Sequence, residues 1–354
     1  LLFCSQRQGR LPLKLPGKNA LTARLLVGER TLALARIGAS MNEKIVHTVM
    51  GPIAADDMGL TLPHEHLFTD LRGPQVVDYA QADPADVVAA MRPFLEAAYA
   101  AGVRSFVECS TTGVGRNVAV LQELAQATPI KLIAPTGVYR QGFIPEELAP
   151  LSAEELAQLW VREINEGIDG TAVKAGFIKI AASDDGVTSL EKRNLQAAAL
   201  AAIETGAVVA SHTIGGATAR QEMEILAGAG LDLSRFIWVH AQTEQDRTFH
   251  REAAERGAFL EFDAIGAPYQ DQESMLAAAL ALIEAGYADQ VLLSHDAGWY
   301  QPGAPSGLPD GGMRGYTALF EDFLPALRAR GVGDDVVQQI TVLNPARAFA
   351  LAPR

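Results

Sequence analysis

Cysteine is scarce in this sequence, which holds only Cys4 and Cys109 among its 354 residues. Two cysteines cannot form the disulfide framework of a small secreted protein, and they do not supply the paired spacing of a zinc-finger site. We therefore expect no disulfide scaffold, find no argument for secretion and predict a cytoplasmic protein.

Long apolar runs and an excess of positive charge are missing as well. No stretch approaches the roughly 20 apolar residues that a membrane-spanning helix needs. The chain has 42 Asp and Glu against 29 Lys and Arg, a net charge of −13. Because such a surface repels nucleic acids and anionic membranes, we expect neither as a partner. Aromatic residues are also few, whereas alanine-rich stretches are frequent, which favours helices.

The first 40 residues depart from this balance, because they contain seven Lys and Arg but a single acid, Glu29. A basic, acid-poor segment is typical of a transit peptide, yet this one lacks the apolar core of a secretory signal. Met41 follows directly. We predict that residues 1–40 are a disordered or non-native upstream extension, and that residues 41–354 form one domain.

From Met41 onward, short apolar runs rich in β-branched residues alternate with amphipathic helical patterns. Such alternation implies parallel strands joined by right-handed crossovers, and eight units of this kind close into a barrel. A doubly wound open sheet is disfavoured because no G-x-G-x-x-G follows the first strand. The predicted fold is a TIM (β/α)₈ barrel. Its predicted strands are Gly59–His64, Val103–Ser110, Lys131–Gly137, Gly176–Ala181, Ala207–His212, Phe236–His240, Ala258–Asp263 and Gln290–Asp296.

Helix-start signals support this reading. Asp83 before Pro84 forms a good cap and first-turn pair, and Ser152-Ala-Glu-Glu155 has the pattern of a capping box. The segment Ala297–Arg314 differs, because it is rich in glycine and proline; we predict a long loop that forms part of the substrate pocket. The predicted helices are Pro84–Ala101, Ser152–Glu166, Leu190–Thr205, Thr218–Ala229, Thr243–Arg256 and Gln272–Gly286.

Four of the seven histidines lie at the C-terminal ends of predicted strands: His64, His66, His212 and His240. That end is where (β/α)₈ barrels build their active sites. His64 and His66 are two residues apart, so both side chains face the same side of their strand. A single such histidine is more often a core residue, but four together favour a metal site, and imidazole suits zinc, cobalt, nickel or iron.

Asp296 and Lys179 extend this set. Counting by twos along the last strand, Asp296 faces the barrel mouth, whereas His295 faces outward. Lys179 lies inside an apolar strand, where an ammonium is costly to bury. It is either a structural lysine, snorkelling or ion-paired, or an amine whose pKa burial lowers. A neutral amine can add CO₂ to form a carbamate, and two carbamate oxygens can bridge two metals.

His64-x-His66, Lys179, His212, His240 and Asp296, in this order, resemble the phosphotriesterase family of the amidohydrolase superfamily. The resemblance extends from about Met41 to about Leu351. The segments that carry it are Gly59-Leu-Thr-Leu-Pro-His-Glu-His66, Thr112-Gly-Val-Gly-Arg116, Gly176-Phe-Ile-Lys-Ile-Ala181 and Ser294-His-Asp296.

The resemblance implies two divalent metal ions, with zinc expected first and cobalt, iron or manganese as alternatives. It assigns the more buried ion to His64, His66 and Asp296, and the more exposed ion to His212 and His240. A carboxylated Lys179 and a hydroxide would bridge the two ions.

The resemblance also implies a hydrolase. Asp296 would take the proton from the bridging hydroxide as it attacks a lactone or ester carbonyl, or an organophosphate ester. Tyr139 resembles a tyrosine that orients the substrate in the lactonase branch, although an aromatic that only packs at a strand end is the alternative. Small-molecule esters, lactones or organophosphates are the implied substrates, and a homodimer is the implied assembly.

Two departures argue against homoserine lactones. The lactonase branch commonly carries an arginine after the aspartate of the seventh strand, but here Asp263 is followed by Ala264 and Ile265. The turn after the sixth strand, His240-Ala-Gln-Thr-Glu244, lacks the usual glycine and aspartate. We expect Asp263 to be structural or a partner at the mouth. Arg314 either meets an anionic substrate or anchors its loop. Further pocket candidates are Phe143, Tyr269, Trp299, Tyr300 and Met313.

Other functions fit the same scaffold. An amidase, a deacylase or a phosphodiesterase could use the same ligands on the same barrel. A non-catalytic binding protein ranks last, because it predicts loss of ligands, and all six candidates are present. A nucleotide-binding protein would need a phosphate loop, which Gly113-Val-Gly115 alone does not supply.

Overall fold

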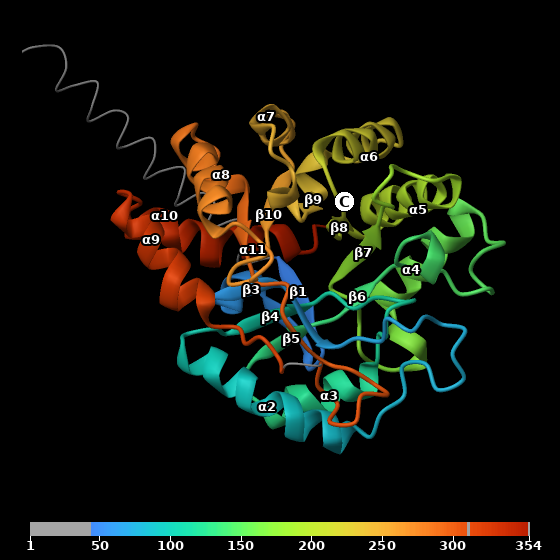
Figure 1. Ribbon diagram of the computed structural model, residues 1–354. Helices are drawn as coiled ribbons and strands as arrows, with labels where there is room; N and C mark the ends of the chain where they lie inside the picture. The colour runs from blue at the N-terminus through green and yellow to red at the C-terminus, as the bar shows by residue number, and fades with distance from the viewer. Residues whose placement is uncertain (1–43, 310–311, 353–354) are drawn as a thin grey trace, which may run out of the picture. The chain divides into compact units, whose positions relative to one another are not determined.

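The computed structural model describes residues 44–309 and 312–352, so the predicted extension at residues 1–40 lies outside the described residues. Figure 1 shows a ring of strands surrounded by helices. All eight predicted strands are present and parallel, and the fold is the predicted TIM barrel. The strands are β3 (Thr61–Phe68), β4 (Ser105–Glu108), β5 (Lys131–Ile133) with β6 (Pro135–Thr136), β7 (Phe177–Ala181), β8 (Val209–His212), β9 (Phe236–Val239), β10 (Phe259–Phe262) and β11 (Val291–Leu293).

Two seams close the ring. At the first, Ala134 divides the third strand into β5, which pairs with β4, and β6, which pairs with β7. At the second, the chain after β11 pairs with β3: Asp296 N donates to the His64 carbonyl at 3.2 Å, and His66 N donates to the Ala297 carbonyl at 3.0 Å. The chain that carries Asp296 is therefore fixed directly beside the two histidines of β3.

The predicted end of the first strand was wrong, because β3 continues to Phe68. Its partner is β12 (Gly298–Tyr300), which lies inside the segment predicted as loop and pairs in parallel with β3. Gly298 has a φ of 91°, and a Cβ there would collide with the His66 carbonyl and the Tyr316 hydroxyl. Only glycine permits this close pairing.

The six predicted helices are all present, within a few residues of their predicted ends. Asp83 accepts from Ala85 N, and the capping box of Ser152 and Glu155 forms as expected. Four helices were not predicted: α3 and the C-terminal α9, α10 and α11. The helices are α2 (Pro84–Ala100), α3 (Val118–Ala127), α4 (Ala153–Asn165), α5 (Ser189–Thr205), α6 (Gly216–Gly228), α7 (Arg247–Glu255), α8 (Gln272–Glu284), α9 (Leu324–Ala329), α10 (Asp334–Gln338) and α11 (Asn344–Phe349).

An antiparallel hairpin precedes the barrel and was not predicted either. It consists of β1 (Ile45–Thr48) and β2 (Gly51–Ala54), and Val49 N in its turn donates to the Leu132 carbonyl of β5. The hairpin therefore packs on the barrel through main-chain pairing. No helix in the described ranges is both long and apolar enough to cross a membrane.

Candidate metal centre

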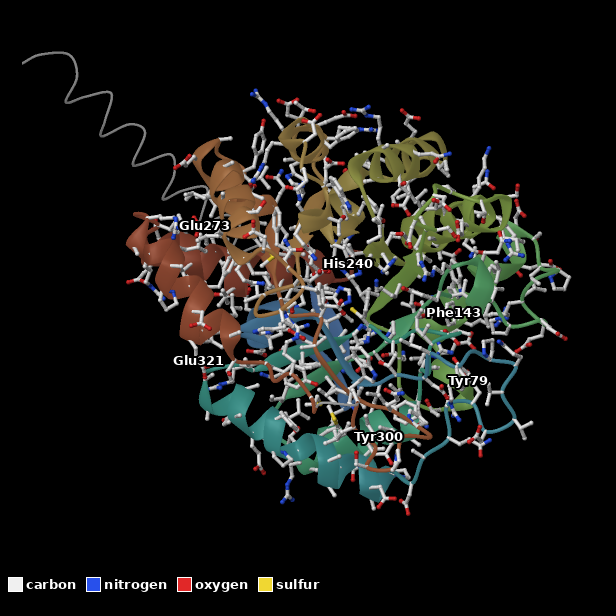
Figure 2. The ribbon with its side chains drawn as sticks, viewed as in Figure 1. Tyr79, Phe143, His240, Glu273, Tyr300 and Glu321 are labelled. Carbon is white, nitrogen blue, oxygen red and sulfur yellow. The ribbon has the colours of Figure 1, made fainter. Side chains whose placement is uncertain are left out.

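The six predicted ligand residues gather around one cavity of about 150 Å³ inside the mouth of the barrel. In Figure 2, His240 lies within the ring of strands, and Phe143, Tyr79 and Tyr300 lie toward the surrounding loops. The cavity is lined by His64, His66, Thr69, Leu71, Cys109, Val114, Tyr139, Lys179, His212, His240, Asp296 and Trp299.

The two histidines of β3 point their Nε2 atoms at the same carboxylate. His64 Nε2 lies 3.5 Å from Asp296 Oδ1, and His66 Nε2 lies 3.2 Å from the same oxygen. Their other ring nitrogens are held from behind: His64 Nδ1 lies 3.0 Å from Glu261 Oε2, and His66 Nδ1 lies 2.7 Å from Ser110 Oγ. When Nδ1 carries the hydrogen of such a contact and the ring is neutral, Nε2 presents a lone pair, the form that binds metal ions.

His240 is held in the same manner by Asp263. Its Nδ1 lies 2.7 Å from Asp263 Oδ1, and its backbone N–H donates to Asp263 Oδ2 at 3.0 Å. Burial would raise the pKa of Asp263, but the contact with His240 outweighs it and lowers that pKa well below its usual value. Asp263 therefore remains a carboxylate. It occupies the partner position at the mouth that we expected for it, and does not face the cavity.

His212 completes the imidazole set. His212 Nδ1 lies 2.8 Å from His240 Nε2 and 3.2 Å from the Tyr139 hydroxyl, so two ring nitrogens and a phenol converge. Burial, together with His240, lowers the pKa of His212 well below its usual value, which keeps the ring neutral. Burial also raises the pKa of Tyr139 to about 12, so its hydroxyl keeps its proton at neutral pH.

Two of these residues have a left-handed backbone. The φ of His240 is 65° and that of Asp296 is 48°. Such conformations cost free energy in residues other than glycine and persist where surrounding contacts hold them. Arg314 supplies such contacts, because it donates to the carbonyls of His295 at 2.7 Å and Asp296 at 2.6 Å, and to that of Ile265. Arg314 thus anchors its loop, which decides between the two roles predicted for it.

Asp296 is a carboxylate in this environment. Burial would raise its pKa, but the contact with His66 and the positive charge of the neighbouring imidazoles outweigh burial and lower the pKa below its usual value. The side chain keeps 24% of its surface exposed toward the cavity. It is therefore ionised and accessible, as a proton acceptor must be.

Glu65 is a buried partner of the chain around Asp296 that the sequence analysis did not predict. Its Oε1 accepts from Ser294 Oγ at 2.8 Å and from the backbone N–H of His295 at 2.9 Å, and lies 2.6 Å from His295 Nδ1. Its Oε2 accepts from Ala297 N at 3.0 Å. Glu65 and His295 are fully buried, His295 Nε2 accepts from Leu319 N at 3.0 Å, and neither residue lines the cavity, which agrees with the predicted outward direction of His295. The sequence did hold a signal for Glu65, because it lies between two inward-facing histidines. Side chains alternate along a strand, so the carboxylate of Glu65 must point outward, into the packing layer behind the strand.

Lys179 reaches the cavity from β7 with only 2% of its surface exposed. Within residues 44–309 and 312–352, its amine takes part in no side-chain hydrogen bond or ion pair. A buried ammonium without a partner is costly, whereas a neutral amine is not, and a carbamate, which is an anion, needs cations beside it. The buried ion pair of the structural reading therefore does not form, which leaves a snorkelling lysine and a carboxylated lysine as the alternatives.

The donor set of the cavity fits divalent metal ions. Ligand atoms of His64, His240 and Asp296 all lie within 4.8 Å of one another. Three of the four imidazoles have Nδ1 held by a buried carboxylate or hydroxyl, and His212 Nε2 is buried without a hydrogen-bond partner among the described residues. Imidazoles with one carboxylate suit zinc and its transition-metal neighbours.

The pocket candidates divide into two groups. Trp299 lines the cavity, with its ring edge-on to His66 at 5.7 Å, and Phe143 packs edge-on against Tyr139 at 5.4 Å. Tyr300 instead stacks on Phe68. Tyr269 is 74% exposed, and neither Tyr269 nor Met313 is among the lining residues. The direction of a loop side chain depends on its tertiary contacts. Sequence position alone therefore predicted more cavity-lining residues than the structure has among these candidates.

Comparison with known proteins places these features in one family. The model of the phosphotriesterase family matches residues 44–349. A phosphotriesterase homology protein of Escherichia coli is 34% identical over 297 residues, which cover 83% of this chain and 99% of the relative. The aryldialkylphosphatase of Saccharolobus solfataricus is 30% identical over 307 residues, 84% of this chain and 97% of the relative. An N-acetyltaurine hydrolase of Xenopus tropicalis is 28% identical over 340 residues, 85% of this chain and 96% of the relative.

Solved structures agree. A variant of the organophosphorus hydrolase from Deinococcus radiodurans superposes with a TM-score of 0.79 at 34% identity, covering 86% of this chain and 96% of that one. A structure described as coming from a weak promiscuous lactonase template superposes with a TM-score of 0.78 at 32% identity, covering 86% of this chain and 99% of that one.

Proposed function

The chain belongs to the phosphotriesterase family of hydrolases, and we propose that it uses two divalent metal ions to cleave lactones, carboxylic esters or organophosphate esters. The observation that carries this proposal is the convergence of Asp296 with anchored imidazoles on one cavity. As neutral rings, His64, His66 and His240 would each turn the Nε2 lone pair inward, because a buried oxygen lies at hydrogen-bond distance from the opposite nitrogen.

The proposed ligands fall into two groups. His64, His66 and Asp296 would hold one ion, and His212 and His240 the other, with zinc as the first candidate and cobalt, iron or manganese as alternatives. When bound, such ions supply a water of lowered pKa and polarise the C=O or P=O group of the substrate.

Lys179, carboxylated by CO₂, would contribute two oxygens between these groups. The amine of Lys179 adds to CO₂ and loses one proton, which gives a carbamate anion. The proposal is supported by the position of Lys179, which lines the cavity and has no side-chain partner within the described ranges that would block its amine.

The protein side chains perform the remaining steps. Asp296 accepts the proton that the attacking water loses, because its carboxylate is ionised and exposed to the cavity. Tyr139 donates a hydrogen bond that orients the substrate, since its hydroxyl stays protonated at neutral pH. Leu71, Val114 and Trp299 give the cavity an apolar wall that limits access of water.

The proposed substrate class is based on the names of the relatives and on one difference from the lactonase branch. Relatives and neighbours are named aryldialkylphosphatase, organophosphorus hydrolase and lactonase, so both carbonyl and phosphoryl esters belong in the first screen. Homoserine lactones are not expected to be preferred, because Ala264 and Ile265 follow Asp263 where the lactonase branch carries an arginine.

Amide hydrolysis is the second candidate. The relative from Xenopus tropicalis is named an N-acetyltaurine hydrolase, and the shared segment covers 85% of this chain. An amide carbonyl can occupy the same cavity as an ester carbonyl, and the same carboxylate can accept the proton of the attacking water.

A hydrolysis panel tests the proposal. Protein prepared with zinc or cobalt and bicarbonate is compared with metal-stripped protein on aryl esters, lactones, phosphotriesters and N-acyl amino acids. Turnover that disappears on stripping and returns with metal is expected for at least one ester class. Turnover of amides alone would favour the second candidate, and turnover of no class would overturn both. The homodimer and the cytoplasmic location stay predictions. Light scattering, which measures the molecular mass in solution, would test the homodimer.

A further inference from the structure

An ion pair lies on the rim of the candidate metal centre, outside the six proposed ligands. Arg140 follows Tyr139 directly, and its Nη1 donates to Asp184 Oδ1 at 2.9 Å. The Arg140 guanidinium lies 5.7 Å from the centre of the Tyr139 ring, and Asp184 Oδ1 lies 4.0 Å from His212 Nε2. The pair therefore adjoins both residues that line this side of the cavity.

Other arginines near the barrel mouth have their donors occupied. Arg72 and Arg116 each pair with two carboxylates, and Arg314 donates to three backbone carbonyls. The guanidinium of Arg140 makes a single hydrogen bond among the residues that the structure describes. Because a guanidinium carries five N–H donors, Arg140 retains donors for a further acceptor.

Asp184 is also a partner that another carboxylate can easily replace at Arg140. Their side chains are 33% and 58% exposed, and ion pairs in contact with water contribute little because solvent screens them. A carboxylate on a ligand can therefore replace Asp184, and the planar guanidinium can hold both of its oxygens at once.

The net negative charge of the chain explains why a local cation would matter for an anionic substrate. The chain carries a net charge of −13, so an anionic molecule is repelled unless a local cation receives it. We propose that Arg140 is a specificity-determining residue that binds a carboxylate on the part of the substrate remote from the cleaved bond, in exchange for Asp184. This inference rests on the hydrolase function proposed above.

Two esters that differ by one carboxylate test it. 4-Nitrophenyl valerate is neutral, and 4-nitrophenyl hydrogen adipate has the same acyl chain with a terminal carboxylate. Arg140→Gln is expected to raise the KM of the anionic ester roughly ten-fold or more, the value of a lost charge-assisted contact, and to leave kcat and the KM of the neutral ester unchanged. Arg140→Lys should retain part of the preference, and Asp184→Asn should lower the KM of the anionic ester.

A matched control is Arg92→Gln, which removes an exposed ion-paired arginine from helix α2; it should alter neither ester. Equal changes for the two esters in Arg140→Gln would overturn the inference. Calorimetry with the product acids, adipate and valerate, separates this failure from failure of the proposed function. If neither ester is hydrolysed, adipate binding that Arg140→Gln abolishes still supports the rim site. Adipate that does not bind, or that binds Arg140→Gln equally well, overturns it.

Discussion

The two sides of the candidate metal centre differ in how firmly the chain holds them. On the β3 side, Glu261 holds Nδ1 of His64 and Ser110 holds Nδ1 of His66. The backbone N–H of Asp296 is hydrogen-bonded to the His64 carbonyl of β3. On the β7 and β8 side, the buried Nε2 of His212 has no hydrogen-bond partner in the described part of the chain.

This difference suits the two sides to different tasks, which are the positioning of the reacting groups and the accommodation of different substrates. Side chains that are held before a ligand arrives keep the reacting groups in register, which favours catalysis. Side chains with spare donors, beside the exposed pair of Arg140 and Asp184, can adapt to different substrates. We therefore propose that the β3 side carries the chemistry and that the β8 side carries selectivity.

The largest expected effect breaks the chemistry on the β3 side. Asp296→Asn should lower kcat by roughly 10² to 10⁴, the contribution of a positioned proton acceptor, while most of the metal stays bound. Steady-state kinetics with metal analysis of the same sample measures both. Asp185→Asn removes an exposed carboxylate near the mouth and is the matched control. Turnover of Asp296→Asn at the level of the parent protein would remove Asp296 from the mechanism.

The next effect concerns the support behind that side. Glu65→Ala leaves the N–H groups of His295 and Ala297 and the hydroxyl of Ser294 without their buried acceptor. We expect a loss of about 3–5 kcal/mol in the free energy of unfolding, measured by urea denaturation. Glu96→Ala, on exposed α2 surface, should change it by less than about 0.5 kcal/mol. Similar losses in both variants would show that Glu65 has no special role.

A pH effect tests the support on the β8 side. Glu222 of α6 is fully buried and accepts from the hydroxyls of Ser211 and Thr213, which flank His212. Burial raises the pKa of Glu222 to about 7 from 4.5. Because the folded protein binds this proton more tightly than the unfolded chain, the contribution is complete below about pH 4.5 and is lost as the pH rises through about 7.

The size of that contribution is on the order of 3 kcal/mol. Glu222→Gln should therefore give a flatter dependence of unfolding free energy on pH between 5 and 8 than the parent protein shows. Urea denaturation at several pH values measures the slope. Parallel slopes for parent and variant would mean that Glu222 does not titrate in this range.

A milder effect is expected at the residue behind His64. Glu261→Gln weakens the acceptor behind His64 and should lower metal affinity roughly 10- to 100-fold, as loss of a partner behind a ligand does. Competition with a chelator measures the affinity. Glu284→Gln, at the exposed end of α8, should leave it unchanged, and an equal affinity in both variants would contradict a positioning role for Glu261.

Much of the fold was predictable because its signals are local. Alternating strands and helices gave the barrel, and histidines at strand ends, with Asp296, identified the cavity. Helix α3 was missed because Val118 and Val120 alternate as they would in a strand. The β1–β2 hairpin was missed because its packing depends on a main-chain contact with the distant Leu132.

The partners of the site were harder to predict for the same reason. Glu65 and Glu261 lie 230 and 197 residues from the histidines they hold. No spacing rule connects residues so far apart in sequence, and only the closed barrel brings them together. The pairing of β12 with β3 also depended on closure, which placed Gly298 against the His66 carbonyl.

The most direct test of the account is the metal content per chain, measured on protein prepared with zinc or cobalt and bicarbonate, beside Lys179→Ala. We predict about two ions per chain, falling sharply in Lys179→Ala and recovering in part when a short carboxylic acid is added to replace the carbamate. One ion or none, unchanged by Lys179→Ala, would contradict a bridged pair of metals and leave Lys179 as a structural lysine.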